Sequence, residues 1–203
     1  MKNLIRFTSL ISFLLLVNYP ISASDSTANQ QTAIFAGGCF WCLESDFEKL
    51  EGVTEAVSGY TGGLASTATY KQVGHVESLH YEAVEVSYDP TIVGYAELVE
   101  YFWRHIDPTD DSGQFCDKGS SYRSAIFYAS DKQKHIIDAS LSKLQNSKPF
   151  AGEIVTRITV AKPFYRAEKY HQNYYKKNPL RYRYYRNSCR RDQRVAQLWG
   201  EHK

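Results

Sequence analysis

Apolar positions along the chain follow two different spacings. Short apolar or alternating runs bounded by glycine or by Asp-Pro predict strands, and apolar residues three or four positions apart predict helices. The predicted strands cover residues 32–36, 53–60, 81–88, 124–128 and 154–160, and the predicted helices cover 40–50, 95–105, 131–144 and 167–175. Because strands alternate with helices, we expect an α/β fold, an α+β two-layer sandwich with a ferredoxin-like plait as its core.

The N-terminal segment differs in pattern from this central part. Lys2 and Arg6 accompany an apolar run at 10–17, and small residues follow at 22–24. This arrangement is typical of a signal peptide over residues 1–23, because the apolar run is too short for the ~20 residues that span a bilayer. We therefore expect an exported protein, periplasmic or secreted, with no stable membrane association after cleavage.

The rest of the chain divides into a polar linker over residues 24–31, a single domain over 32–177 and a tail over 178–203. The tail is rich in tyrosine and arginine and has little apolar periodicity. We expect it to be extended and wrapped on the domain, with its rings packed and its guanidinium groups in solvent.

Arginines beside tyrosines are also the ingredients of nucleic-acid binding. Loss of the signal peptide removes Lys2 and Arg6 from the 24 basic residues and leaves 22, equal to the 22 acidic residues. A neutral exported chain argues against nucleic acid as a partner.

The chain contains four cysteines, Cys39, Cys42, Cys116 and Cys189. An even number in an exported protein suggests two disulfides. A domain of about 180 residues buries enough surface to fold without them, and so catalytic thiols are an equally good reading of the count.

One cysteine occupies a position that favours reactivity. Gly37-Gly38-Cys39 follows a predicted strand and precedes a predicted helix. The free N–H groups and the dipole at a helix start stabilise a thiolate. A decrease of ~1.5 units in the pKa would leave half of this thiol ionised at pH 7. Such a decrease requires the surroundings to stabilise the thiolate over the thiol by about 2 kcal/mol. Cys39 is therefore predicted to be a nucleophile.

The segment Gly38-Cys39-Phe40-Trp41 resembles the signature of A-type peptide methionine sulfoxide reductases. Further segments match the family in order and spacing, and the resemblance extends over about residues 32–200. These segments include residues 59–63, 69–70, 80–84, 88–90, 105–108, 114–119, 122–126, 163–165 and 167–172. The resemblance implies that 32–177 is a catalytic domain that reduces methionine S-sulfoxide in proteins, in peptides and as the free amino acid.

The resemblance also implies roles for individual residues. Cys39 would attack the sulfoxide sulfur. Glu82 would be the acid that protonates the oxygen, and its pKa must be raised by apolar surroundings to keep it protonated. The implied substrate-binding residues are Phe40, Trp41, Tyr70, Asp117 and Tyr122. Glu168 and His171 are candidates for a supporting layer, although core tyrosines, turn acids and buried histidines are common without any such role.

Attack leaves a sulfenic acid on Cys39, which a second thiol must resolve. Cys189 in Cys189-Arg-Arg-Asp192 resembles the resolving cysteine of a subgroup that has glycine where this chain has Arg190. Cys42 is the alternative resolving thiol, because Cys39 and Cys42 also form a C-x-x-C motif. Cys116 is expected to be structural.

The resemblance implies no metal or organic cofactor, a thioredoxin-like protein as reductant, and a monomer. Two other interpretations of Cys39 and Cys42 also fit the sequence. A thioredoxin-type oxidoreductase would use Cys39 and Cys42 with Pro90 as the proline that faces them. A zinc site would join the same two thiols to His75 and His80.

Overall fold

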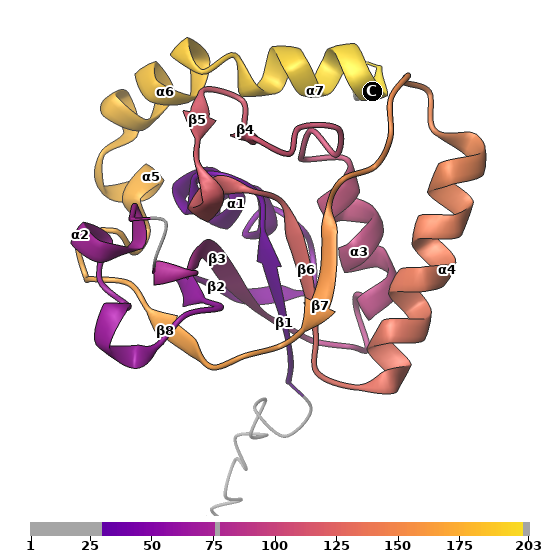
Figure 1. Ribbon diagram of the computed structural model, residues 1–203, viewed down its shortest axis with the longest axis horizontal. Helices are drawn as coiled ribbons and strands as arrows, with labels where there is room; N and C mark the ends of the chain where they lie inside the picture. Colours follow the sequence, from indigo (N-terminus) through magenta and orange to yellow (C-terminus); the bar gives the residue numbers. More distant parts are fainter. Residues whose placement is uncertain (1–29, 76–77, 201–203) are drawn as a thin grey trace, which may run out of the picture.

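The computed structural model describes residues 30–75 and 78–200 (Figure 1). The predicted signal peptide and most of the predicted linker lie outside the described residues. No helix in the described ranges is long and apolar enough to cross a bilayer.

A six-stranded mixed sheet forms the centre of the domain, with the strand order β7-β6-β1-β3-β2-β8. All neighbouring strands are antiparallel except β6 and β7, which are parallel. The strands are β1 (Gln31–Ala36), β2 (Val53–Thr61), β3 (Tyr81–Tyr88), β6 (Ala125–Tyr128), β7 (Arg157–Val160) and β8 (Phe164–Arg166). A separate two-stranded ribbon consists of β4 (Gly113–Gln114) and β5 (Asp117–Lys118).

The helices cover the sheet and its edges. They are α1 (Phe40–Phe47), α2 (Tyr70–Val73), α3 (Tyr95–Trp103), α4 (Asp131–Ser147), α5 (Tyr174–Lys177), α6 (Pro179–Ser188) and α7 (Arg191–Trp199). Short 3₁₀ turns lie at Ala65–Thr67 and Ser120–Tyr122. Figure 1 shows α3 beside α4, and α6 and α7 running across the domain next to β4 and β5.

The core lies where α1 and α3 pack on the sheet. Phe35 of β1 stacks on Phe47 of α1 at 4.9 Å and on Phe102 of α3 at 5.1 Å between ring centroids. These side chains are fully buried. Burial of a large aromatic side chain stabilises the fold by roughly 1.5–3 kcal/mol, and this contact fixes α1 directly against the strand that precedes it.

The predicted α/β class is confirmed, and the first four predicted strands and the first three predicted helices are present. The fifth predicted strand, 154–160, is present as the shorter β7. The predicted helix at 167–175 and the predicted extended tail are wrong. The segment predicted as a helix at 167–175 is largely irregular, with α5 beginning only at Tyr174, and β8 was not predicted.

The extended tail is the second wrong prediction, because it folds into α6 and α7. Pro179 begins α6, where its missing N–H costs nothing. The face that α7 buries consists of Arg191, Val195 and Leu198, three or four positions apart. A buried arginine disguises this periodicity in a sequence read by apolar positions alone.

Candidate active site

Cys39 lies between β1 and α1, as predicted, and is the N-cap residue of the helix. Gly38 precedes it with φ +81°, a left-handed conformation that favours glycine. A Cβ at Gly38 would lie 2.6 Å from Cβ of Gln114. The amide of Gln114 is fixed in turn, since it donates to the Asp107 carbonyl at 2.7 Å. The thiol is thus placed by a close approach that only glycine permits.

The electrostatics of the two thiols differ from the expectation at the sequence level. Burial, followed by the contacts with Cys42 and Glu82, raises the pKa of the Cys39 thiol well above its usual range. A hydrogen bond from Cys39 lowers the pKa of Cys42, and the charges of Arg191 and Arg186 act in the same direction. The expectation of a low pKa for Cys39 was based on the helix start alone and did not include the burial of the thiol. The thiol is only 6 % exposed, and its ionisation requires further donors.

Glu82 is the second residue of β3 and lies against the start of α1. The Phe40 N–H donates to Oε2 of Glu82 at 3.2 Å. Burial raises the pKa of Glu82 to about 8, although the bonds from Phe40 and Tyr122 oppose the shift. As the sequence predicts, this carboxyl is therefore largely protonated at pH 7 and able to donate a proton.

A cavity of about 70 Å³ joins these groups. It brings together seven residues that the sequence predicted and adds one that it did not, Tyr185 of α6. The lining residues are Cys39, Phe40, Trp41, Tyr70, Glu82, Asp117, Tyr122 and Tyr185. The cavity therefore presents a thiol and a protonated acid to one small volume with aromatic walls.

The aromatic wall of the cavity is held by a second layer of residues. Trp41 donates to Nδ1 of His171 at 3.0 Å and stacks on Tyr174 at 3.7 Å between centroids. The carboxylate of Glu168 accepts from the Tyr70 backbone N–H at 3.0 Å. His171 and Glu168 thus support the walls rather than enter the cavity.

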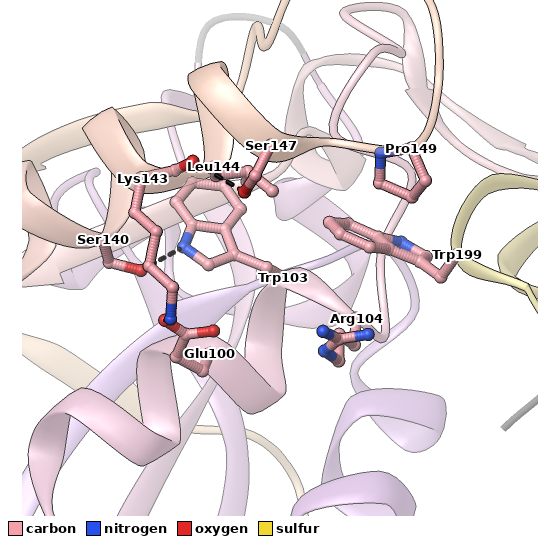
Figure 2. A pocket seen from close by; sticks show the side chains of 9 residues that line it. All are labelled: Glu100, Trp103, Arg104, Ser140, Lys143, Leu144, Ser147, Pro149 and Trp199. Atoms are coloured by element: carbon pink, nitrogen blue, oxygen red, sulfur yellow. Dashed lines mark hydrogen bonds and ion pairs between the residues drawn. The ribbon is translucent and has the colours of Figure 1, made fainter. Parts of the chain in front are cut away.

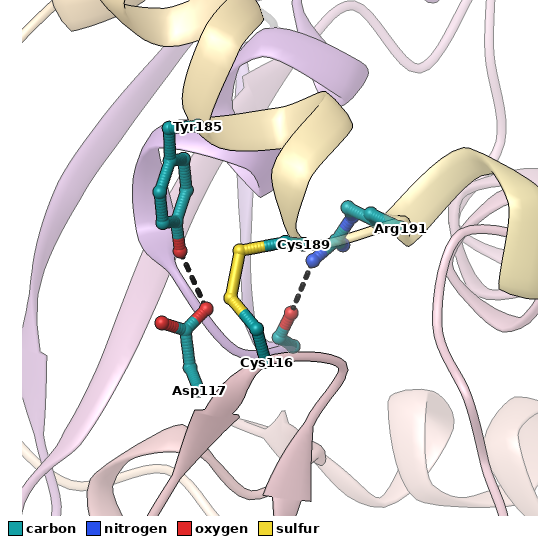
Figure 3. The surroundings of a disulfide bond; sticks show 6 residues. Cys116, Asp117, Tyr185, Cys189 and Arg191 are labelled. Atoms are coloured by element: carbon teal, nitrogen blue, oxygen red, sulfur yellow. Dashed lines mark hydrogen bonds between the residues drawn. A yellow bond between two sulfur atoms is a disulfide. The ribbon is translucent and has the colours of Figure 1, made fainter.

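Two cysteines form a disulfide beside the cavity, Cys116 and Cys189, with Cα atoms 4.9 Å apart (Figure 3). Cys116 is exposed and Cys189 is half-buried, whereas Cys39 and Cys42 are free thiols and buried. Cys116 directly precedes Asp117 of the cavity. The disulfide therefore adjoins a residue of the cavity wall and includes one exposed cysteine.

Arg190 follows Cys189 with φ +54°. The glycine that the related subgroup has at this position adopts that conformation without strain. Arg190→Gly should therefore raise the free energy of unfolding by about 0.5 to 1 kcal/mol. Chemical denaturation measures this change. Arg183→Gly, at an exposed position inside α6, should lower stability by about 1 kcal/mol, and equal effects of both substitutions would contradict the explanation.

Two tail arginines, Arg186 and Arg191, anchor α6 and α7 to the domain. Arg191 is 2 % exposed and donates to the carbonyls of Gly37 at 3.0 Å and His105 at 2.8 Å. The buried Asp46 pairs with Arg186 at 2.9 Å and with Arg191 at 3.7 Å. The expectation that the guanidinium groups stay in solvent is wrong for these two residues, and they are committed to the fold rather than to nucleic acid.

A larger pocket of about 310 Å³ lies between α3, α4 and the end of α7 (Figure 2). Trp103 donates to Ser140 Oγ at 3.1 Å inside it, and Lys143 pairs with Glu100 at 2.9 Å. The pocket shares no residue with the Cys39 cavity and is lined by no cysteine. The chemistry therefore belongs to the smaller cavity.

Comparison with known proteins agrees with this geometry. The family model described as "Peptide methionine sulfoxide reductase" matches residues 31–203. The chain belongs to the peptide methionine sulfoxide reductase family. Reduction of methionine sulfoxide is the reaction of this family, and a thiol beside a protonated acid is what that reaction requires.

Individual relatives are similar over most of their length. The chain is 48 % identical to peptide methionine sulfoxide reductase MsrA of Bacillus subtilis, over 84 % of this chain and 97 % of the relative. It is 45 % identical to MsrA/MsrB of Vibrio cholerae, over 89 % of this chain and 48 % of that longer protein.

Solved structures share the fold. Reduced Mxr1 of Saccharomyces cerevisiae has a TM-score of 0.70 at 33 % identity, over 75 % of this chain and 88 % of Mxr1. Methionine sulfoxide reductase A of Corynebacterium diphtheriae has a TM-score of 0.67 at 34 % identity, over 76 % of this chain and 78 % of that protein.

The two rival readings of Cys39 and Cys42 lose support in this structure. Pro90 follows β3 at the end that pairs with Gln31, whereas Cys39 follows the opposite end of β1. Pro90 therefore does not face the two thiols.

The hypothesis of a zinc site is opposed by the contacts of His80, one of its proposed ligands. His80 uses both ring nitrogens within the domain, towards the Gly63 N–H at 3.3 Å and the Leu64 carbonyl at 3.0 Å. In the part of the chain that the structure describes, Cys39 and Cys42 belong to no group of three potential metal ligands.

Proposed function

We propose that this protein reduces the S epimer of methionine sulfoxide, in proteins, in peptides and as the free amino acid, with Cys39 as nucleophile and Glu82 as acid. The thiol and the raised pKa of the carboxyl in one cavity carry the proposal. The Cys39 sulfur bonds to the sulfoxide sulfur, and Glu82 gives its proton to the oxygen. The S–O bond of the substrate then breaks and its hydroxyl group, which carries the proton from Glu82, is transferred to the Cys39 sulfur. The bond between the two sulfur atoms breaks at the same time, so that methionine departs with the electron pair and Cys39 becomes a sulfenic acid.

The walls of the cavity fit the rest of the substrate. The Tyr70 and Tyr122 hydroxyls and the Asp117 carboxyl supply polar contacts for the sulfoxide oxygen, and Phe40 and Trp41 supply an apolar slot for the S-methyl group. Burial raises the pKa of Tyr70 and Tyr122, which keeps both hydroxyls as donors. A sulfoxide oxygen is a strong acceptor and is bound best by such donors.

Resolution is assigned to Cys189, followed by Cys116. Cys189 would attack the sulfenic sulfur of Cys39 and release water, and Cys116 would then attack Cys189 and free the Cys39 thiol. The supporting observations are the Cys116–Cys189 disulfide beside a free Cys39, and α6 itself, which reaches Cys39 through Tyr185 one turn before Cys189. Cys116 thus receives a redox role in place of the structural role expected from the sequence.

Cys42 is the alternative resolving thiol, because its backbone N–H donates to the Cys39 carbonyl at 3.1 Å and its pKa is lowered by hydrogen bonding with Cys39. One equivalent of methionine sulfoxide added to the fully reduced protein, followed by mass spectrometry of the disulfides, separates the two routes. The assignment predicts Cys116–Cys189 in the wild type and in Cys42→Ser, and a Cys39–Cys189 bond in Cys116→Ser. A Cys39–Cys42 bond in Cys116→Ser, with unresolved sulfenic acid in Cys42→Ser, would contradict it.

A thioredoxin-like protein is the reductant that fits this arrangement. The exposed Cys116 offers the disulfide sulfur that a protein dithiol can reach. Yeast Mxr1 "in complex with Trx2" is similar to this chain at 25 % identity with a TM-score of 0.52.

We further propose that the leader at 1–23 directs export and that the exported protein is a monomer. We also propose that the central strands β6-β1-β3-β2 form a ferredoxin-like plait, with α1 and α3 as its crossover helices.

A further inference from the structure

Tyr185 lies in the cavity without a part in the scheme above. It comes from α6, and its hydroxyl donates to Oδ2 of Asp117 at 2.5 Å (Figure 3). Tyr185 and Cys39 line the same small cavity, and hydrogen bonding by Tyr185 lowers the pKa of the Cys39 thiol. Its ring meets Trp41 edge-on at 5.8 Å between centroids. Asp117 therefore holds the Tyr185 hydroxyl and Trp41 holds its ring, so that the side chain is fixed in the cavity of the Cys39 sulfur.

The Cys39 thiol needs such a donor. Its burial removes the water that would otherwise solvate a thiolate, and both Cys42 and Glu82 oppose a negative charge there. Among the main influences on the pKa of Cys39, hydrogen bonding by Tyr185 lowers it. The pKa of Tyr185 itself is raised far above its usual range by burial and by the acidic groups beside it, and so the phenol keeps its proton.

We propose that Tyr185 is a catalytic residue that stabilises the Cys39 thiolate during its attack on the sulfoxide, with Asp117 holding the hydroxyl in place. The proposal deepens the function proposed above and rests on it. It gives α6 a part in the chemical step as well as in resolution, because Tyr185 and Cys189 are one helical turn apart on the same helix.

Tyr185→Phe tests the proposal, because it removes the hydroxyl and keeps the ring against Trp41. Tyr184→Phe is the matched control, since Tyr184 is the adjacent residue of α6 and its side chain is 78 % exposed. Two measurements are made on each protein: the pH dependence of Cys39 alkylation by iodoacetamide, followed by mass spectrometry, and the rate of a single turnover with saturating methionine S-sulfoxide. The titratable groups that face Cys39 are Cys42, Tyr70, Glu82, Asp117, Tyr122 and Tyr185.

In Tyr185→Phe we expect the midpoint of Cys39 alkylation to rise by about one pH unit and the single turnover at pH 7 to slow about tenfold. Tyr184→Phe should match the wild type in both. Incorporation of 3-fluorotyrosine at position 185, a stronger donor with nearly the same shape, should move the midpoint down and keeps the test valid if the phenylalanine variant folds poorly.

An unchanged midpoint in Tyr185→Phe, or an equal shift in Tyr184→Phe, would overturn the role of Tyr185. The alkylation midpoint does not depend on sulfoxide reduction. A wild type that forms no methionine would therefore contradict the proposed function and leave the measured Tyr185–Cys39 interaction standing, so the two failures are distinguishable.

Discussion

Replacing Glu82 with glutamine should lower the rate of the chemical step by about 10²- to 10⁴-fold, the usual contribution of a general acid. Glutamine keeps the size of the side chain but has no acidic proton to transfer. Burial raises the pKa of Glu82 to about 8, so the wild-type acid is protonated below this value and loses its proton above it. Ionisation of the Cys39 thiol raises the rate as the pH rises, and loss of the Glu82 proton opposes this rise above about pH 8. The wild-type profile should therefore show an alkaline decline, and Glu82→Gln should keep the rise and lack this alkaline decline. Single-turnover rates between pH 6 and 9.5 measure both effects.

Glu85→Gln is the matched control for this prediction. Glu85 lies on the same strand, is half-buried, and does not line the cavity. Its substitution should leave the rate within a factor of two or so of the wild type. A Glu82→Gln variant with the wild-type rate, or one that keeps the alkaline decline, would show that another group supplies the proton.

Replacing Arg191 with methionine should lower the free energy of unfolding by about 3 kcal/mol or more. The guanidinium group is buried, donates to the Gly37 and His105 carbonyls, and lies beside the carboxylate of Asp46. Methionine fills much of the space but leaves both carbonyls without this donor, and Asp46 keeps Arg186 and Lys49 as its charged partners. Chemical denaturation followed by circular dichroism measures the loss.

The neighbouring Arg190 provides the comparison, because it is exposed and has the same side chain. Arg190→Met should change the stability by less than about 0.5 kcal/mol. Since Gly37 precedes the Gly38-Cys39 turn, Arg191→Met should also slow the chemical step. If Arg191→Met proved as stable as Arg190→Met, the anchoring of α7 by this arginine would be refuted.

The motif around Cys39 was predictable because its chemistry is local. A strand, two glycines and a helix start are adjacent in sequence, and they position the thiol by themselves. Glu82 was accessible through the resemblance, and its raised pKa follows from the apolar setting that a protonated acid requires. These features depend on short segments and on the residue types within them.

The contribution of the tail was not predictable by the same reasoning. Tyr185 and Arg191 look like solvent-exposed residues in a polar segment, and their burial depends on Asp117 and Asp46, which are 68 and 145 positions away. The raised pKa of Cys39 has the same origin, because the helix start is visible in the sequence and the burial of the thiol is not. A helix from residue 179 places Tyr185 one turn before Cys189, and this spacing is the sequence signal for its position beside the resolving cysteine.

The most direct test of the account is methionine formation from methionine S-sulfoxide with dithiothreitol as reductant. The protein without its predicted leader is compared with Cys39→Ser, and methionine R-sulfoxide serves as the substrate control. We expect methionine from the S epimer with the wild type alone, and little from the R epimer. No methionine from a folded and reduced wild type, or equal amounts from Cys39→Ser, would contradict the assignment of Cys39 as the nucleophile of a methionine sulfoxide reductase.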